Sequence, residues 1–88
     1  MVKTKHGTFE VRSITFGERR ELHRIELKAN KDGTIDPDGY FNLLEFVMNK
    51  AFENPAKALE KFDDNEVDEI LNDIYMHYKG LSKKKNSK

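Results

Sequence analysis

The oxygen-bearing side chains of residues 30–36 (NKDGTID) are spaced as in a metal-binding loop. They alternate around Gly33, as the ligands of a calcium-binding EF-hand loop do. With Gly33 in the sixth position, however, the first position is Lys28, a cation, and the twelfth is Gly39 instead of a glutamate. A second register makes Glu45 the twelfth residue, but its entering helix would have to run through this same turn-forming segment. A turn followed by a helix cap explains these residues better, and we expect no calcium site.

Other residue types give no catalytic or cofactor-binding pattern. The acidic residues near the end of the chain fall at a helix start and on its outward face, where the helix dipole and solvent favour carboxylates. The three histidines have no second histidine or cysteine at metal-ligand spacing. The five glycines stand singly, so no phosphate-binding loop is present. We therefore expect a protein that is not an enzyme and needs no metal or cofactor.

The composition of these 88 residues predicts one small folded domain. Hydrophobic and charged residues each make up 36% of the chain, which is polar but too rich in large apolar residues for wholesale disorder. There is no cysteine, so no disulfide can compensate for a small core. No stretch resembles a signal peptide or approaches the roughly 20 apolar residues that cross a bilayer, so we expect a cytoplasmic protein without a membrane partner.

The net charge is zero, but the charges are unevenly distributed. Of the 16 basic residues, five lie among the last ten, which contain no acid. We interpret residues 82–88 as a flexible, solvated, Lys-rich tail that follows a single domain over residues 1–81. No arginine or aromatic residue interleaves with the lysines after Tyr78, which argues against nucleic acid as the partner.

The elements that would position any site begin with a β-hairpin over about residues 2–12. Phe9 and Val11 alternate with polar residues, and Gly7 can supply the positive φ that a hairpin turn needs. Because two strands alone are marginally stable, their apolar side chains must pack on helices.

Capping signals predict helices over about residues 16–29, 37–53, 55–61 and 64–79. Thr15 and Glu18 have the spacing of a capping box. Asp36 and Asn54 are each followed directly by proline, which suits the first position of a helix, and Asp63 can cap the last helix. The fold class is therefore α+β and mostly α, with an N-terminal hairpin, three to four helices and a disordered basic C-terminal tail.

Two of these helices have recognisable apolar faces. In the last helix the face recurs at helical spacing over Val67, Ile70, Leu71, Ile74, Tyr75 and Tyr78. In the helix over residues 37–53 it comprises Tyr40, Leu43, Leu44, Val47 and Ala51. That second helix also carries the large apolar residues Phe41, Phe46, Met48 and Phe52, more than one buried stripe requires.

The order of these features resembles the tail assembly chaperones of tailed bacteriophages. The resemblance is carried by the hairpin, residues 14–22 (ITFGERREL), the acidic amphipathic helix and residues 78–85 (YKGLSKKK). Members are small, mostly helical, divergent proteins encoded just before the tape-measure protein. The resemblance implies a non-enzymatic protein of the host cytoplasm that binds and solubilises the tape-measure protein, or another helical tail protein, during tail assembly. It transfers no individual binding residue and leaves open whether the protein forms a homo-oligomer.

The surplus of large apolar side chains suits such a role, because a helical client can be shielded by helix-in-groove contacts. The candidate partner-binding residues are Phe41, Phe46, Met48 and Phe52. Each of them could instead pack on the hairpin or on the last helix, and the sequence leaves both interpretations open.

The alternative is a small regulatory or nucleic-acid-associated protein. Its basic tail and the face of the first helix that carries Arg19, Arg20 and Arg24 would then contact phosphate. Neighbouring genes distinguish the two hypotheses. A tape-measure gene directly downstream supports the chaperone, and an isolated gene beside a promoter supports the regulator.

Overall fold

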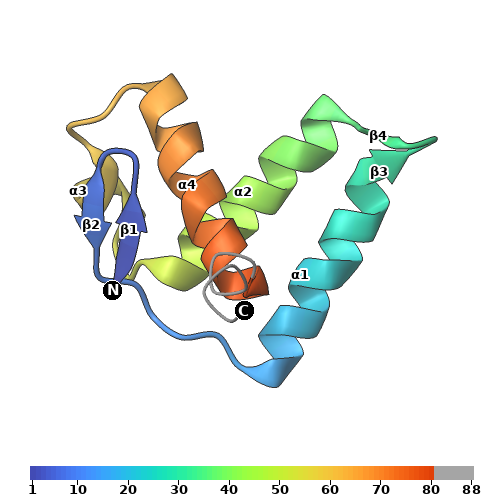
Figure 1. Cartoon of the computed structure of the whole chain (residues 1–88), viewed down its shortest axis with the longest axis horizontal. Coiled ribbons are helices and arrows are strands. Elements are labelled where there is room, and N and C mark those ends of the chain that lie inside the picture. Colours follow the sequence, from blue (N-terminus) through green and yellow to red (C-terminus); the bar gives the residue numbers. More distant parts are fainter. Residues whose placement is uncertain (81–88) are drawn as a thin grey trace, which may run out of the picture.

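The computed structural model describes residues 1–80, apart from the side chain of Lys31, and the expected tail over residues 82–88 lies outside the described residues. It confirms the mostly helical α+β fold, with an N-terminal antiparallel hairpin and then four helices. The elements in chain order are β1 (Val2–Thr4), β2 (Gly7–Phe9), α1 (Phe16–Ala29), β3 (Asn30–Lys31), β4 (Thr34–Ile35), α2 (Pro37–Ala51), α3 (Pro55–Leu59) and α4 (Asp64–Lys79) (Figure 1).

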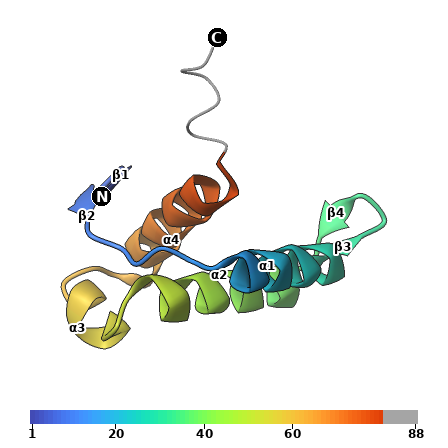
Figure 2. The same ribbon diagram turned by 90° about the horizontal axis from the view of Figure 1, so that it is seen from below.

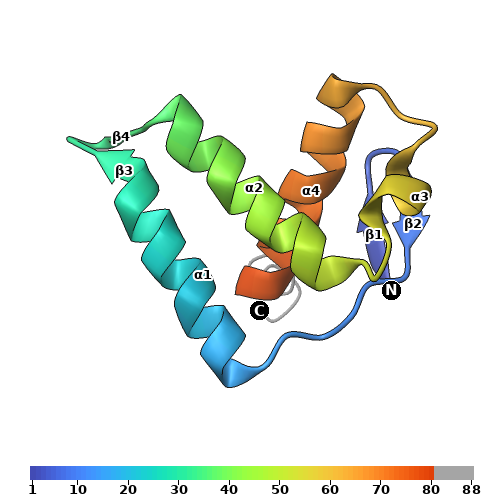
Figure 3. The same cartoon turned by 180° about the vertical axis from the view of Figure 1, so that it is seen from behind.

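Helix α2 is the central element of the fold. It packs against α1 on one side and against α4 on the other, and β1 packs on α4 (Figures 1 and 3). Figure 2 shows α1 and α2 side by side in one layer, with α4 and the β1–β2 hairpin on one side of that layer. The chain therefore buries α4 and the hairpin against one another and against the α1–α2 pair.

The core draws on the hairpin and on all four helices. The predicted apolar faces of α2 and α4 are confirmed, because most of their members are buried and the others are partly buried against them. The buried core residues are Val2, Leu22, Leu43, Leu44, Val47, Ala51, Phe52, Leu59, Ile70, Leu71, Ile74 and Tyr78.

The predicted helix starts are confirmed by their hydrogen bonds. Thr15 and Glu18 form a capping box, in which the Thr15 hydroxyl accepts from the Glu18 N–H at 3.1 Å and the Glu18 carboxylate accepts from the Thr15 N–H at 2.9 Å. Asp63 forms the second capping box at the start of α4. Gly80 ends α4 with a φ of 79°, a left-handed conformation that glycine adopts without a steric penalty.

The hairpin is shorter than expected. Its strands end at Phe9, whereas the sequence pattern predicted a hairpin to residue 12, although Gly7 does have the expected positive φ of 119°. The backbone of Arg12 pairs with helix α2 instead of with β1, since its N–H donates to the Ala51 carbonyl at 3.0 Å. The last carbonyls of α2 have no partner within the helix, so the backbone N–H of Arg12 bonds to one of them and the strand is not extended.

Two helices also end earlier than predicted. Helix α2 stops at Ala51 and not at residue 53, because Phe52 is extended and turns its ring into the core beside Phe9. Helix α3 stops at Leu59 and not at residue 61, and the chain then tightens into a turn in which the Phe62 N–H donates to the Leu59 carbonyl at 3.1 Å.

The turn between α1 and α2 contains a second hairpin that the sequence analysis did not predict. Residues 30 and 31 pair with residues 35 and 34 across a two-residue loop. Asp32 and Gly33, which form that loop, have φ values of 51° and 86°, as a type I′ turn requires. The Asp-Gly pair thus specifies a tight turn, and Asp36 caps α2 directly after it, as the interpretation of this segment as a turn and a helix cap predicts.

Candidate protein-binding site

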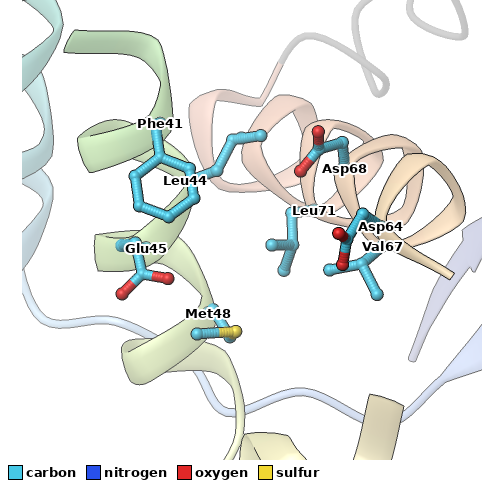
Figure 4. Close-up of a pocket in the computed structure, with 8 residues that line it drawn as sticks. All are labelled: Phe41, Leu44, Glu45, Met48, Asp64, Val67, Asp68 and Leu71. Atoms are coloured by element: carbon cyan, nitrogen blue, oxygen red, sulfur yellow. The ribbon is translucent and has the colours of Figure 1, made fainter. Parts of the chain in front are cut away.

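An open groove of about 500 Å³ lies between α2 and α4, and we call it the α2–α4 groove. Four side chains come from each helix (Figure 4). The lining residues are Phe41, Leu44, Glu45 and Met48 on α2 and Asp64, Val67, Asp68 and Leu71 on α4.

Both helices contribute with the same periodicity. On α2 the lining residues are Phe41 and the residues three, four and seven positions after it. On α4 they are Asp64 and the residues at the same intervals after it. Residues at this spacing form one stripe on a helix surface. Two facing stripes produce a groove that runs between the helices, into which side chains of a third helix can insert.

The groove is apolar at its floor and becomes more exposed toward its rim. Leu44 and Leu71 form the floor, with 2% and 3% of their surfaces exposed. Met48 and Val67 are half-buried, and Phe41 is 59% exposed. The floor therefore belongs to the folding core, whereas Phe41 leaves a large apolar surface in contact with water.

The charges on the groove are all of one sign. Its described lining includes the carboxylates of Glu45, Asp64 and Asp68 and no basic side chain. Asp68 also affects Tyr40, which donates a hydrogen bond to Asn72 at 3.1 Å. Burial, and then the charge of Asp68, raise the pKa of the Tyr40 phenol, so this donor stays protonated at neutral pH.

Of the four predicted partner-binding residues, Phe41 and Met48 line this groove and two do not. Phe46 is half-buried on a different face of α2, and the Lys50 ammonium lies 5.5 Å from the centre of its ring. Lys50 also pairs with Glu18 of α1 at 3.5 Å, so Phe46 lies toward the α1–α2 contact.

Phe52 belongs to the core. It is 7% exposed, and its ring meets that of Phe9 edge-on at a centroid distance of 6.2 Å. Packing on the hairpin was one of the two interpretations that the sequence left open for this residue, and it is the arrangement that the fold contains.

The α4 side of the groove was not predicted from the sequence. Leu71 was expected to be a core residue, and Asp64 and Asp68 were expected to be solvated acids of an outward face. Comparing the spacing of α2 and α4 would have revealed two matching stripes, but nothing in the sequence shows that these stripes face one another.

Other kinds of site have little support in the described part of the chain. Residues 1–80 contain no group of three or more His, Cys, Asp or Glu side chains that could hold a metal ion. None of the described helices is both long enough and apolar enough to span a membrane. No protein-family model, curated protein or solved structure matches the chain.

Proposed function

We propose that the protein binds a helical segment of another protein in the α2–α4 groove and thereby keeps that partner soluble. The observation that carries the proposal is the apolar stripe of α2 that remains open beside α4, with Phe41 exposed at its rim. The resemblance to tail assembly chaperones supplies the identity of the client. It is the tape-measure protein, or another helical tail protein, held in the host cytoplasm during tail assembly.

The physical basis is burial of apolar surface. A client helix that places its own apolar side chains over Phe41 and Met48 removes these two residues and its own side chains from water. Each Å² of apolar surface buried in this way stabilises the complex by about 25 cal/mol. The groove volume accommodates a few side chains and not a whole helix, so these act as the anchors of a longer contact.

The acidic rim adds selectivity. Glu45, Asp64 and Asp68 favour a client segment that carries Lys or Arg beside its apolar stripe, and they disfavour an acidic one. Asp64→Asn together with Asp68→Asn should therefore slow association and weaken its salt dependence, with the fold intact. A stopped-flow measurement at two salt concentrations tests this. Unchanged association rates would show that the rim has no part in recognition.

The proposed function is tested by co-expression with the product of the adjacent large gene. Wild-type protein should raise the soluble fraction of that product, and Phe41→Ser should cost about 2 kcal/mol of binding, or roughly 30-fold in Kd. Phe16→Ser is the matched control, because Phe16 is also an exposed phenylalanine but lies outside the groove. Equal solubilisation by wild type and Phe41→Ser would refute the site. A neighbouring gene that does not encode a tape-measure protein would refute the named client.

A further inference from the structure

A second hollow, of about 340 Å³, lies between the start of α1 and the end of α4. It is lined by Phe16, Arg19, Arg20 and His23 of α1 and by Lys79 of α4. We call it the basic hollow. On α1 the other lining residues lie three, four and seven positions after Phe16, so all four form a single stripe on that helix.

The acidic residues of α1 do not neutralise its arginines at positions 19 and 20, because each of these acids is paired with another residue. Glu18 pairs with Lys50 at 3.5 Å, and Glu21 pairs with Arg24 at 2.9 Å. Glu26 pairs with Lys79 at 2.7 Å and lies 3.3 Å from His23, so these two members of the hollow already have a carboxylate partner. By contrast, Arg19 and Arg20 are exposed and form no ion pair with any residue of the described chain. Two guanidinium groups are thus left free to bind an anion.

Phe16 supplies a flat apolar surface beside these cations. It is 72% exposed, and its ring stacks on no other aromatic ring among residues 1–80. An aromatic side chain with arginines three and four positions later combines the two contacts that a nucleotide offers, a base to stack and a phosphate to pair.

We propose that the basic hollow binds single-stranded nucleic acid, with a base on Phe16 and the adjacent phosphates on Arg19 and Arg20. An acidic peptide fits less well, because Phe16 is the single apolar side chain in the lining and a peptide would need further pockets for its own side chains. The lysines that follow Tyr78 in the sequence have no aromatic residue among them. Here the ring and the cations come together on one helix.

The acidity of the rest of the molecule does not prevent this. Asp64 and Asp68 lie near the start of α4 and Lys79 at its end, and a helix of 16 residues spans about 24 Å. The Debye length at physiological ionic strength is about 8 Å, so the groove carboxylates are largely screened from a strand in the basic hollow.

The test is fluorescence anisotropy of the full chain with a short labelled oligothymidylate at several salt concentrations. Each phosphate contact contributes about −0.7 to the slope of log K against log salt for a single strand. Contacts to Arg19 and Arg20 would therefore weaken binding roughly sevenfold between about 50 and 200 mM salt. Arg20→Gln should reduce the magnitude of the slope by about 0.7, whereas Phe16→Ala should weaken binding at least about fivefold and leave the slope unchanged.

Two control variants separate the basic hollow from other cations. Arg24→Gln removes the same charge from α1 outside the hollow and should change neither affinity nor slope. The triple variant Lys83→Gln, Lys84→Gln, Lys85→Gln tests the tail. If it abolishes binding while the Phe16 and Arg20 variants bind like wild type, the tail is the binding site and the proposal is wrong.

Two competitors test the class of ligand. A thymidine mononucleotide should compete far less well than the oligonucleotide, and equal competition would mean that the ligand is a free nucleotide. Oligoglutamate of the same charge should displace little, and equal displacement would show a general anion surface and overturn the proposal. None of these outcomes bears on client binding at the α2–α4 groove, which has its own assay.

Discussion

At the scale of single residues, Arg12 holds the end of α2 against α4. Its guanidinium donates to the carbonyls of Asn49 and Lys50 at 3.1 and 3.2 Å, which closes the C-terminus of α2. Its own carbonyl accepts from the Tyr78 hydroxyl at 2.6 Å. Burial raises the pKa of Tyr78 to about 12, so this hydroxyl remains a donor at neutral pH. One linker residue thus fixes the two helices that form the groove.

Arg12→Met should lower the free energy of unfolding by about 1 kcal/mol, because it removes the side-chain hydrogen bonds and retains the backbone ones. Urea denaturation followed by circular dichroism measures the change. Arg24→Met is the control, since its exposed ion pair with Glu21 should contribute less than about 0.5 kcal/mol. Equal effects of the two substitutions would mean that the hydrogen bonds of the Arg12 side chain to α2 add no more to stability than an exposed ion pair does.

Phe41 lies on α2 and Phe52 directly follows that helix, but substituting them should change stability by very different amounts. Phe52→Ser removes a buried ring and should cost about 3–5 kcal/mol, a large share of the stability of a domain this small. Phe41→Ser replaces an exposed ring and should change the free energy of unfolding by less than about 0.5 kcal/mol. Thermal melting of both variants checks the assignment, and a strongly destabilised Phe41→Ser would contradict a rim position.

At the scale of elements, the contact of α1 with α2 depends on a close approach at Gly39. A Cβ atom at this position would lie 2.7 Å from both the Cα and the Cβ of Ala29, which is buried. That distance is shorter than van der Waals contact between carbon atoms. The start of α2 can therefore pack against the end of α1 only with glycine at this position.

Gly39→Ala should consequently destabilise the domain by about 1–3 kcal/mol, although alanine is normally the better helix former. Gly17→Ala, near the start of α1, should have the opposite sign and stabilise by up to about 1 kcal/mol, since its nearest neighbour would be the Thr15 hydroxyl at 3.9 Å. Chemical denaturation of both variants provides the comparison. Stabilisation by both would show that α1 and α2 separate more readily than their packing indicates.

Glu26 joins α1 to α4 and makes that contact sensitive to pH. Burial opposes its ionisation, but hydrogen bonds from Lys79 and Tyr75 and the charge of Lys79 outweigh burial, so the pKa of Glu26 lies below its usual value. The folded state therefore holds the carboxylate more strongly than the unfolded chain does. This contribution to stability is complete above the unfolded pKa of about 4.3 and is lost as the pH falls through the folded pKa.

Glu26→Gln should therefore be less stable than wild type at neutral pH, and the difference should shrink as the pH falls below about 4. Unfolding free energies of both proteins across this range measure the effect. Glu21→Gln, which disrupts an exposed pair with Arg24, should show little difference at any pH. A gap between wild type and Glu26→Gln that is constant with pH would contradict the role of the ionised carboxylate.

At the scale of the whole molecule, the charges separate into two surfaces. The α2–α4 groove is rimmed by carboxylates near the start of α4, whereas the basic hollow lies at the end of α4 beside the start of α1. Because the two surfaces share no lining residue, they should act independently.

Independence gives a crossed prediction. Phe41→Ser should reduce client solubilisation and leave oligonucleotide affinity unchanged, whereas Arg20→Gln should have the reverse effect. Both activities should be measured on both variants. The activity that each variant keeps shows that the variant is still folded. Loss of both activities in a folded variant would show that the surfaces are coupled.

Most element boundaries follow from local sequence, and for that reason they were predictable. A hydroxyl or carboxylate cap bonds to a backbone N–H no more than three residues away, and proline and glycine restrict or free only their own backbone. The spacing of apolar residues then indicates which face of a helix is buried. Two of the errors arose where a distant partner decided the local conformation, whereas the β3–β4 hairpin was missed although Asp32 and Gly33 specify it locally. Arg12 left the hairpin to cap α2, and Phe52 ended α2 so that its ring could reach Phe9.

The sequence by itself determined that this chain forms one small, mostly helical domain with more large apolar residues on α2 than a single face can bury. Only the tertiary structure decided which of those residues remain open. Phe41 stays exposed because α4 crosses α2 with its own stripe facing the same groove, whereas Phe52 is buried because the hairpin lies over the end of α2. Helical periodicity specifies a face but not the neighbour that covers it, and that neighbour comes from contacts between residues far apart in the chain.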